Sequence, residues 1–355
     1  MDRRKFVKIT TTTAAASALG GVHLQSAEDG RVKMGQIGTK HAHASGQIQT
    51  ARKLNDQFEV VGVVEPDKAR RAQMESHPAY KGVRWLTEEE LLGTPGLQVV
   101  AVETEIRDLL STAQRCVDAG MHIHLDKPAG ASMEPLRKLH ETAQKKSLMI
   151  QMGYMFRYNA AFRFLFDAVN RGWLGEVFEV HGVMSKTVND ATRRELAEFP
   201  GGSMFELGCH LIDPLLHILG KPDRVSGYLR NTQPEKDDLA DNTLAVFEFE
   251  KATATVRSAV VEVDGGRRRQ FVLCGDQGTV DIKPLEPARL ELTLAKSVGG
   301  FKKGTQQVDL PKSKGRYHGA WSDIIQVIKG QKDHEFSHEH DLAVQQALLT
   351  ACHVG

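Results

Sequence analysis

The alternation of short apolar runs with helical segments across residues 31–152 limits the fold more than any other feature of the sequence. Each apolar run has the length of a strand, and the segments between the runs carry helix periodicity or helix caps. Strands that alternate with helices pair in parallel, because each connection must cross back over the sheet. We therefore predict a Rossmann-like doubly wound parallel sheet with strands at 32–37, 58–64, 83–86, 97–102, 122–125 and 148–152.

Local signals place the helices of this first half. Thr87 and Glu90 have the spacing of a capping box, and Gly120 is a typical helix stop after the segment 108–119. The predicted helices are 46–54, 87–92, 108–119 and 134–146.

The periodicity changes in the second half of the chain. From residue 224 onward, strands follow one another with only turns between them, which is typical of an antiparallel sheet. A polar loop is predicted at 185–200. We expect an α+β domain over 153–355, and its last helices are candidates to pack back on the 31–152 domain. The predicted strands are 177–184, 224–229, 243–250, 253–263, 270–274, 279–282 and 290–294, and the helices 160–171, 320–329 and 341–350.

Composition excludes several kinds of partner. The chain has 46 basic and 45 acidic residues, a net charge of +1, which gives no argument for a nucleic-acid or anionic-membrane partner. No apolar run is long enough to span a bilayer, so we predict no transmembrane anchor in the mature chain. The four cysteines lack the spacing of a zinc motif or a disulfide framework.

The N-terminus has the features of an export signal. Arg3 and Arg4 precede Phe6, and a mild Thr/Ala-rich stretch follows over 9–21. This order resembles a bacterial twin-arginine signal. We predict that residues 1–28 are such a segment and that the protein is periplasmic or otherwise exported. A cytoplasmic protein with a disordered tail is the alternative.

The turn after the first strand carries part of a dinucleotide-binding pattern. Gly38 is the first of three expected glycines, and Lys40 and His43 replace the other two. The Lys40 ammonium could still reach a pyrophosphate by charge. Glu65 ends the second strand 27 residues after Gly38, where an acid accepts both ribose hydroxyls and repels a 2′-phosphate. This favours NAD over NADP; a solvated turn at 65–67 is the alternative.

The fifth strand ends in Asp126, Lys127 and Pro128. Open α/β sheets bind ligands at the carboxyl ends of their strands. Pro128 restricts the backbone of Lys127, so the main chain that carries the ammonium is conformationally restricted. The alternative is a surface Lys-Pro turn.

A second group of polar residues occurs at 206–213. Glu206, His210 and Asp213 have the i, i+4, i+7 spacing of one helix face. An imidazole flanked by two acids suits general acid–base catalysis, in which one acid orients the ring and the other holds a substrate hydroxyl. A capped amphipathic helix with a structural histidine is the alternative.

Two His-x-His pairs, 41/43 and 122/124, raise the question of a metal. Residues two apart face the same way in a strand. No third ligand is spaced convincingly near either pair, so the sequence alone predicts no metal site.

Together these stretches resemble the glucose–fructose oxidoreductase / inositol dehydrogenase / MocA family. Residues 126–128 are similar to its Glu-Lys-Pro motif, 153–159 to its Gly-Tyr-x-x-Arg segment, and 201–213 to its Gly-Gly…His-x-x-Asp helix. Residues 338–340 and the last helix look like its C-terminal end. The resemblance covers nearly all of 31–355. It implies NAD(P)-dependent oxidation or reduction at a hydroxyl-bearing carbon of a sugar, polyol or related compound.

The resemblance also implies residue roles. Lys127 would contact the reacting hydroxyl, His210 would be the general base, and Glu206 stands where the family usually has Asp. The second domain would bind substrate and form homo-oligomers, with the 185–200 loop and Tyr317–His318 shaping specificity. The implied cofactor residues are Gly38, Thr39, Lys40, His41, Glu65, Asp126 and Lys127, and the implied substrate residues are Tyr154, Arg157, Lys186 and Asp213.

Three functions remain open at this point. The first is an exported NAD-dependent oxidoreductase that holds and recycles its cofactor, because free NAD is scarce outside the cytoplasm. The second is an NAD-dependent glycosidase with no net redox change. The third is a non-catalytic binding protein on the same fold, which the altered glycine turn motivates.

Overall fold

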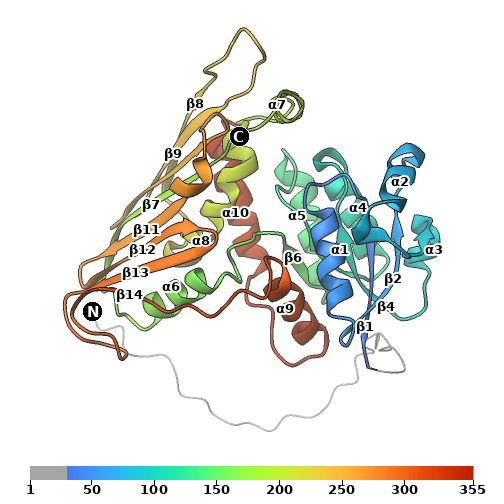
Figure 1. Cartoon of the computed structure of the whole chain (residues 1–355), viewed down its shortest axis with the longest axis horizontal. Coiled ribbons are helices and arrows are strands. Elements are labelled where there is room, and N and C mark those ends of the chain that lie inside the picture. The colour runs from blue at the N-terminus through green and yellow to red at the C-terminus, as the bar shows by residue number, and fades with distance from the viewer. Residues whose placement is uncertain (1–29, 355) are drawn as a thin grey trace.

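The computed structural model describes residues 30–354, which form two domains side by side, each built on its own sheet (Figure 1). The predicted export signal, residues 1–28, lies outside the described residues. The chain passes from the first sheet to the second after strand β6 (Ile150–Met152).

The first domain is a six-stranded parallel sheet in the order β3-β2-β1-β4-β5-β6. This confirms the predicted doubly wound sheet, and its order is that of a dinucleotide-binding fold, with the switch point between β1 and β4. The strands are β1 (Val32–Ile37), β2 (Phe58–Val64), β3 (Trp85–Leu86), β4 (Leu97–Val102), β5 (His122–Leu125) and β6. The helical elements are α1 (Ala44–Lys53), α2 (Lys68–Glu75), η1 (Pro78–Tyr80), α3 (Glu88–Leu92), α4 (Ile106–Asp118) and α5 (Met133–Lys145).

Strand β4 explains why helices must cover both faces of this sheet. All six of its residues are buried, and they alternate between two cores. Val100 and Val102 belong to the core that contains α4 and α5, whereas Val99 and Ala101 belong to the core that contains α1. A strand that is buried on both faces consists of a nearly continuous run of apolar residues. This run is why β4 could be predicted from the sequence.

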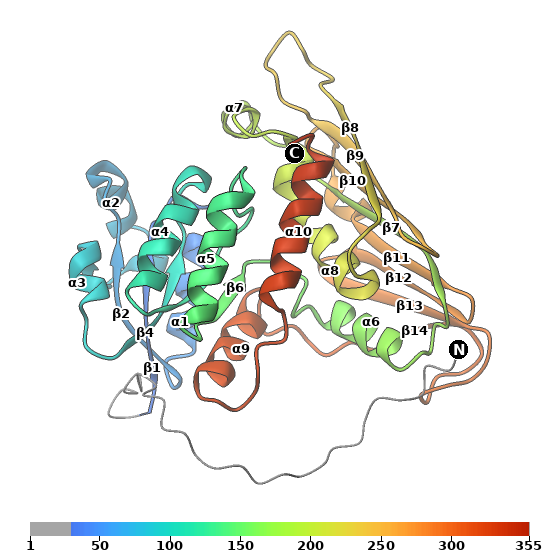
Figure 2. The same ribbon diagram turned by 180° about the vertical axis from the view of Figure 1, so that it is seen from behind.

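The second domain is an eight-stranded sheet in the order β14-β13-β12-β11-β7-β10-β9-β8, antiparallel except for the β7–β10 pair. Helices α6, α8 and α10 lie on its face toward the first domain (Figure 2). The strands are β7 (Val177–Ser185), β8 (Arg224–Arg230), β9 (Asn242–Glu248), β10 (Thr253–Ala259), β11 (Gln270–Gly275), β12 (Gly278–Leu285), β13 (Ala288–Leu294) and β14 (Gly304–Gln307). The helical elements are α6 (Ala160–Asn170), α7 (Asp190–Ala197), the π-helical η2 (Met204–Gly208), α8 (Cys209–Leu219), η3 (Gly265–Arg268), α9 (His318–Ile328) and α10 (His338–Ala351).

The polar loop predicted at 185–200 is wrong in part, because it contains helix α7. Asn189 caps this helix by accepting a hydrogen bond from the Thr192 amide at 2.9 Å. Arg193 is buried and forms ion pairs with Asp237 at 2.8 Å and Asp241 at 3.2 Å. These partners are more than 40 positions away, so the local sequence gave no signal of the contacts that hold the helix. The short edge strand β14 was also not predicted.

Helix α9 packs against the first domain, although it follows the second sheet in the chain (Figure 2). Trp321 is fully buried; its indole Nε1 donates to Gln47 Oε1 at 2.9 Å, and its ring meets Phe58 edge-on at 5.3 Å. Within residues 30–354, no helix is long and apolar enough to cross a membrane.

We expect Trp321→Ala to lower the free energy of unfolding by about 3–5 kcal/mol, because it removes a large buried aromatic ring and leaves a cavity. Chemical denaturation followed by far-UV circular dichroism measures this change. Phe178→Ala is the control; that ring is 49% exposed, and its loss should cost about 0.5 kcal/mol or less. Equal losses in the two variants would mean that α9 does not contribute to the core of the first domain.

Candidate active site

The turn between β1 and α1 requires glycine at one position. Gly38 has a φ of +89°, and a Cβ there would lie 2.6 Å from the Glu103 carbonyl carbon. Only glycine combines that conformation with so close an approach of the two backbones. The first position of the dinucleotide pattern therefore has its usual geometry.

Glu65 lies at the end of β2, where the sequence placed the ribose-binding acid. It is largely buried, and its Oε2 accepts hydrogen bonds from the Thr39 amide at 3.0 Å and the Thr39 hydroxyl at 2.6 Å. Arg70 donates to the Thr39 carbonyl at 2.6 Å. Glu65 is thus held beside the glycine turn by Thr39, a residue that the sequence analysis also assigned to the cofactor.

Lys40 does not extend freely from the turn. Its Nζ forms ion pairs with Asp67 at 3.1 Å and Glu105 at 3.3 Å, which follow β2 and β4. A hydrogen bond to Asp67 raises the pKa of this ammonium. The contact predicted between Lys40 and a pyrophosphate would require these exposed ion pairs to open, at a cost of about 1 kcal/mol or less for each.

Lys127 and Glu206 join the two domains. Lys127 is buried at the end of β5, and its Nζ donates to the Glu206 carbonyl at 3.0 Å and to Glu206 Oε2 at 3.2 Å. Lys186, at the end of β7, lies 3.5 Å from the other Glu206 oxygen. Burial is the largest influence on the pKa of Lys127 and lowers it, but the charges around it, that of Glu206 first, together leave the net pKa raised. For Glu206, burial is again the largest influence and raises the pKa, but the nearby positive groups, Lys127 and then Lys186 first, together leave it lowered. Both groups are therefore charged.

His210 lies one turn beyond Glu206. It is buried, and its Nδ1 has no hydrogen-bond partner among the described residues. Its ring centroid lies 6.1 Å from that of Phe156 and 6.4 Å from that of His43. Burial, followed by the nearby Lys127 charge, holds the pKa of His210 well below its usual value. The imidazole is therefore neutral at pH 7, as a general base must be.

A cluster of acids and histidines fills the carboxyl edge of the sheet beside these residues. Asp126 Oδ2 lies 3.0 Å from His41 Nδ1 and 3.1 Å from His43 Nδ1. Glu103, at the end of β4, is completely buried, and neither of its oxygens has a hydrogen-bond partner in the part of the chain that the structure describes. His43 and Glu103 were not predicted as site residues. The signal available for Glu103 was an apolar strand, 97–102, that ends in an acid.

Arg157 and Asp213, which the sequence predicts as substrate contacts, belong to a buried network of ion pairs. Both are completely buried, and Arg157 Nη2 donates to Asp213 at 2.7 Å and to Asp341 at 2.5 Å. His340 Nε2 lies 2.9 Å from the same Asp213 oxygen. The buried Tyr154 ring lies 4.9 Å from the Arg157 guanidinium. These residues anchor helix α10.

The predicted one-face alignment of Glu206, His210 and Asp213 is also wrong. Residues 204–208 form a π-helical turn, so the sequence around Glu206 does not follow α-helical spacing. Glu206 reaches the Lys127 ammonium across the domain boundary, whereas Asp213 pairs with Arg157 in the interior.

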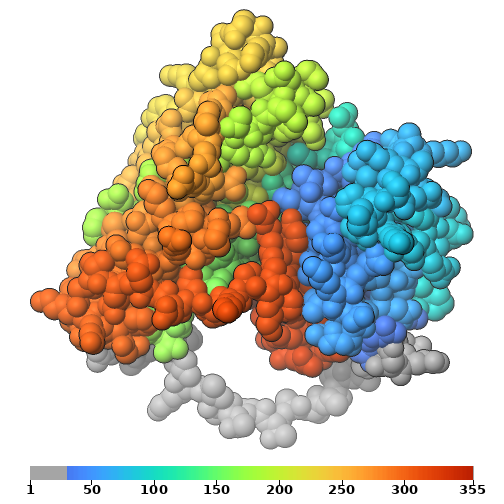
Figure 3. Space-filling model, viewed as in Figure 1, coloured from blue at the N-terminus to red at the C-terminus, as the bar shows by residue number. Residues whose placement is uncertain are grey.

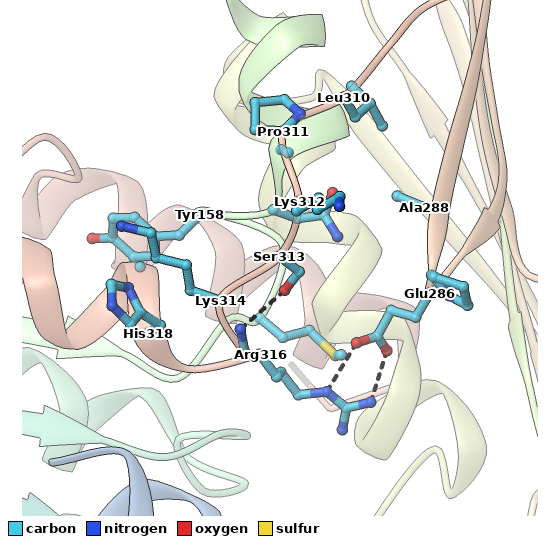
Figure 4. A pocket seen from close by; sticks show the side chains of 16 residues that line it. Tyr158, Glu286, Ala288, Leu310, Pro311, Lys312, Ser313, Lys314, Arg316 and His318 are labelled. Carbon is cyan, nitrogen blue, oxygen red and sulfur yellow. Dashed lines mark hydrogen bonds and ion pairs between the residues drawn. The ribbon is translucent and has the colours of Figure 1, made fainter. Parts of the chain in front are cut away.

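A pocket of about 750 Å³ opens between α9 and the second sheet, where the surface in Figure 3 is hollowed. Glu286 and Arg316 form an ion pair on its wall, and Tyr158 and His318 border its other side (Figure 4). The next residue, Tyr317, has its ring 5.8 Å from that of His43. The pocket therefore adjoins the histidine cluster, and its lining includes part of the segment predicted to shape specificity.

Two family profiles match the chain, and together they cover most of it. Residues 32–154 match the oxidoreductase family with an NAD-binding Rossmann fold, and 162–281 match the GFO/IDH/MocA C-terminal domain. The chain belongs to the GFO/IDH/MocA oxidoreductase family. This confirms the resemblance drawn from the sequence motifs.

Individual relatives are distant. The chain is 24% identical to scyllo-inositol 2-dehydrogenase (NADP(+)) IolW of Bacillus subtilis over 185 residues, which is 52% of this chain and 51% of that protein. It is 24% identical to inositol 2-dehydrogenase 3 of Saccharopolyspora erythraea over 275 residues, 76% of each chain. The fold matches the aldose–aldose oxidoreductase of Caulobacter crescentus with a TM-score of 0.74 at 18% identity, covering 91% of this chain and 98% of that one. The chain spans about half the length of IolW.

A dinucleotide fits part of this site. Gly38 leaves open the space that a Cβ would fill, and Glu65 lies where its carboxylate can accept hydrogen bonds from ribose hydroxyls. Lys127, Glu206 and His210 meet next to this crevice at the carboxyl edge of the sheet. His41 and His43 differ from the usual turn, because they bring imidazoles where the fold normally has little side-chain bulk.

We expect Arg157→Met to lower the free energy of unfolding by about 3–5 kcal/mol, because it leaves two buried carboxylates without their cation. Arg163→Met is the matched control, since the Arg163–Glu335 ion pair of 2.7 Å lies at the surface and should contribute about 1 kcal/mol or less. Urea denaturation measures both variants. A small loss for Arg157→Met would argue that its site is open to water.

Proposed function

We propose that this protein is an NAD(P)-dependent oxidoreductase that transfers hydride between the nicotinamide and a hydroxyl-bearing carbon of a sugar, polyol or related compound. The observation that carries the proposal is the meeting of Lys127, Glu206 and His210 at the carboxyl edge of a dinucleotide-binding sheet. The names of relatives that act on inositols and aldoses support the substrate class.

Each of the three residues has a role that follows from its charge state. The Lys127 ammonium donates a hydrogen bond to the reacting oxygen and stabilises negative charge that develops there. The neutral His210 ring takes the hydroxyl proton. Glu206 fixes the Lys127 ammonium, which otherwise would have the rotational freedom of a long side chain. The bound nicotinamide would supply hydride acceptance and donation.

We expect His210→Gln and Lys127→Met to lower kcat by at least about 10²-fold, because each removes a group that handles the proton or the charge of the reacting oxygen. Nucleotide content of His210→Gln should stay near that of the parent, since His210 is not among the implied cofactor residues. Activity is measured with pairs of sugars and polyols, so that one compound can be oxidised while the other is reduced.

His217→Gln is the control, because His217 lies on the same helix but packs against Phe166 and away from Lys127. The nucleotide is measured on protein purified without added cofactor, then denatured and analysed by mass spectrometry. Absence of both released nucleotide and NAD binding would refute the proposed oxidoreductase and leave a binding protein on this fold.

We further propose NAD as the preferred cofactor, because the Glu65 carboxylate would repel a 2′-phosphate. Glu65→Ser should raise the ratio of kcat/KM for NADP over that for NAD by about tenfold or more, since a like-charge contact is removed. Steady-state kinetics with both cofactors measure the ratio. Glu75→Ser, a change on the exposed end of α2, is the control and should leave the ratio unchanged. A parent enzyme that prefers NADP would contradict this proposal.

We propose that the protein is exported through a twin-arginine signal and works in the periplasm. The support is the Arg3–Arg4 pair with Phe6 and the Thr/Ala-rich stretch after it. Twin-arginine export carries folded proteins, which would let the cofactor enter before export and stay bound during turnover.

We also propose a homo-oligomer. The second sheet has helices on the face toward the first domain, whereas no α-helix of residues 30–354 covers its other face in Figures 1 and 2. That sheet carries two large exposed side chains, Phe178 on β7 and Tyr228 on β8. Aromatic side chains are enriched at protein interfaces.

A further inference from the structure

We propose that His41, His43 and Asp126 bind a divalent first-row transition-metal ion, such as Zn²⁺, at the carboxyl edge of the first sheet. The proposal is separate from the oxidoreductase activity and does not depend on a bound nucleotide. It also supplies the third ligand that the sequence spacing did not reveal: Asp126 follows the histidine pair by more than 80 positions.

The spacing of the three ligand atoms suits such an ion. Asp126 Oδ2 lies 3.0 Å from His41 Nδ1 and 3.1 Å from His43 Nδ1, and the ligand atoms of this group all lie within 4.8 Å of one another. Ligands about 2.1 Å from a tetrahedral Zn²⁺ are about 3.4 Å apart. Binding would therefore require shifts of only a few tenths of an ångström for the two Asp126 contacts.

A hydrogen bond to the main chain orients the His41 ring toward the carboxylate. Its Nε2 lies 3.0 Å from the Lys127 carbonyl oxygen, which can only accept, so Nε2 carries the hydrogen. Its Nδ1 lies 3.3 Å from the His43 amide, which can only donate, so Nδ1 is the acceptor. The same Nδ1 lies 3.0 Å from Asp126 Oδ2. A bound cation would take the Nδ1 lone pair in place of the long contact to the His43 amide, and the Lys127 carbonyl orients the ring as a second-shell partner does.

Glu103 provides an independent observation. Its side chain is completely buried, both oxygens lack a hydrogen-bond partner, and Oε2 lies 3.7 Å from His41 Nδ1. Two buried acidic side chains, Glu103 and Asp126, thus converge on one histidine. A buried polar group without a partner is costly, and a divalent ion among these residues would give the Glu103 oxygens one.

The donor set indicates the class of ion and leaves room for a further ligand. Two imidazoles and one carboxylate are typical of Zn²⁺ or Fe²⁺ sites, whereas Mg²⁺ and Ca²⁺ prefer oxygen ligands. Three protein ligands leave at least one position open, as in catalytic metal sites. His43 also borders His210, so the open position lies near the residues proposed to handle the substrate hydroxyl.

The test uses the full chain, treated with a chelator and then titrated with Zn²⁺ by calorimetry and with Co²⁺ by visible absorption. We expect one ion per chain and Co²⁺ ligand-field bands. His43→Ala and Asp126→Asn should each weaken binding by at least about 10²-fold, because each removes a direct ligand, and even loss of a second-shell partner costs 10–100-fold. His353→Ala, on the exposed C-terminal end of the chain, should bind as the parent does.

Melting curves of the metal-free variants show whether each is folded. If Asp126→Asn is unfolded, His43→Ala alone decides, because the His43 side chain is partly exposed and its loss should be tolerated. No stoichiometric binding by the parent, or equal binding by parent and His43→Ala, would overturn the proposal. The cluster would then be a proton-sharing network with His41 as an imidazolium. Released nucleotide is measured separately, so failure of the metal proposal leaves the oxidoreductase proposal intact.

Discussion

The site depends on one buried ion pair that crosses the domain boundary. Lys127 comes from the end of a strand in the first sheet, and Glu206 comes from the π-helical turn of the second domain. The Lys127 ammonium is buried, and without Glu206 it would lose its ion-pair partner. The pair therefore fixes how the two domains meet, and it places His210, one turn after Glu206, at the carboxyl edge of the first sheet. Domain arrangement and candidate chemistry rest on the same contact.

A second buried network, centred on Arg157, also stabilises the arrangement of the two domains. Arg157 follows the last strand of the first domain and holds Asp213 from α8 and Asp341 from α10. Helix α8 carries His210, so the arginine fixes the helix whose imidazole is the candidate base. Asp213 itself pairs with Arg157 and His340, so its charge helps to position this helix.

The sequence predicted most of the fold, because the signals for strands and caps are local. Strand β4 is a run of apolar residues, and Thr87 and Glu90 form the predicted capping box. Helix α7 was missed because it is held by Arg193 contacting Asp237 and Asp241, which no local pattern reveals. The candidate site was likewise predicted only where its signals are local. Lys127 and His210 stand in recognisable motifs, whereas the convergence of Glu103 and Asp126 on His41 arises only when three strands lie side by side.

The changes from the usual glycine turn and the convergence of acids on His41 belong together. A histidine in place of a turn glycine occupies space where a pyrophosphate would lie, and a buried acid beside it is electrostatically unfavourable. Either the histidine or the acid alone would weaken the binding of an anion by this turn. Together, His41 and His43 face the carboxylate of Asp126, so this acid has two nitrogen partners, whereas Glu103 has no hydrogen-bond partner among the described residues. The altered turn therefore agrees with the proposed cation site, on the edge where this fold otherwise binds an anion.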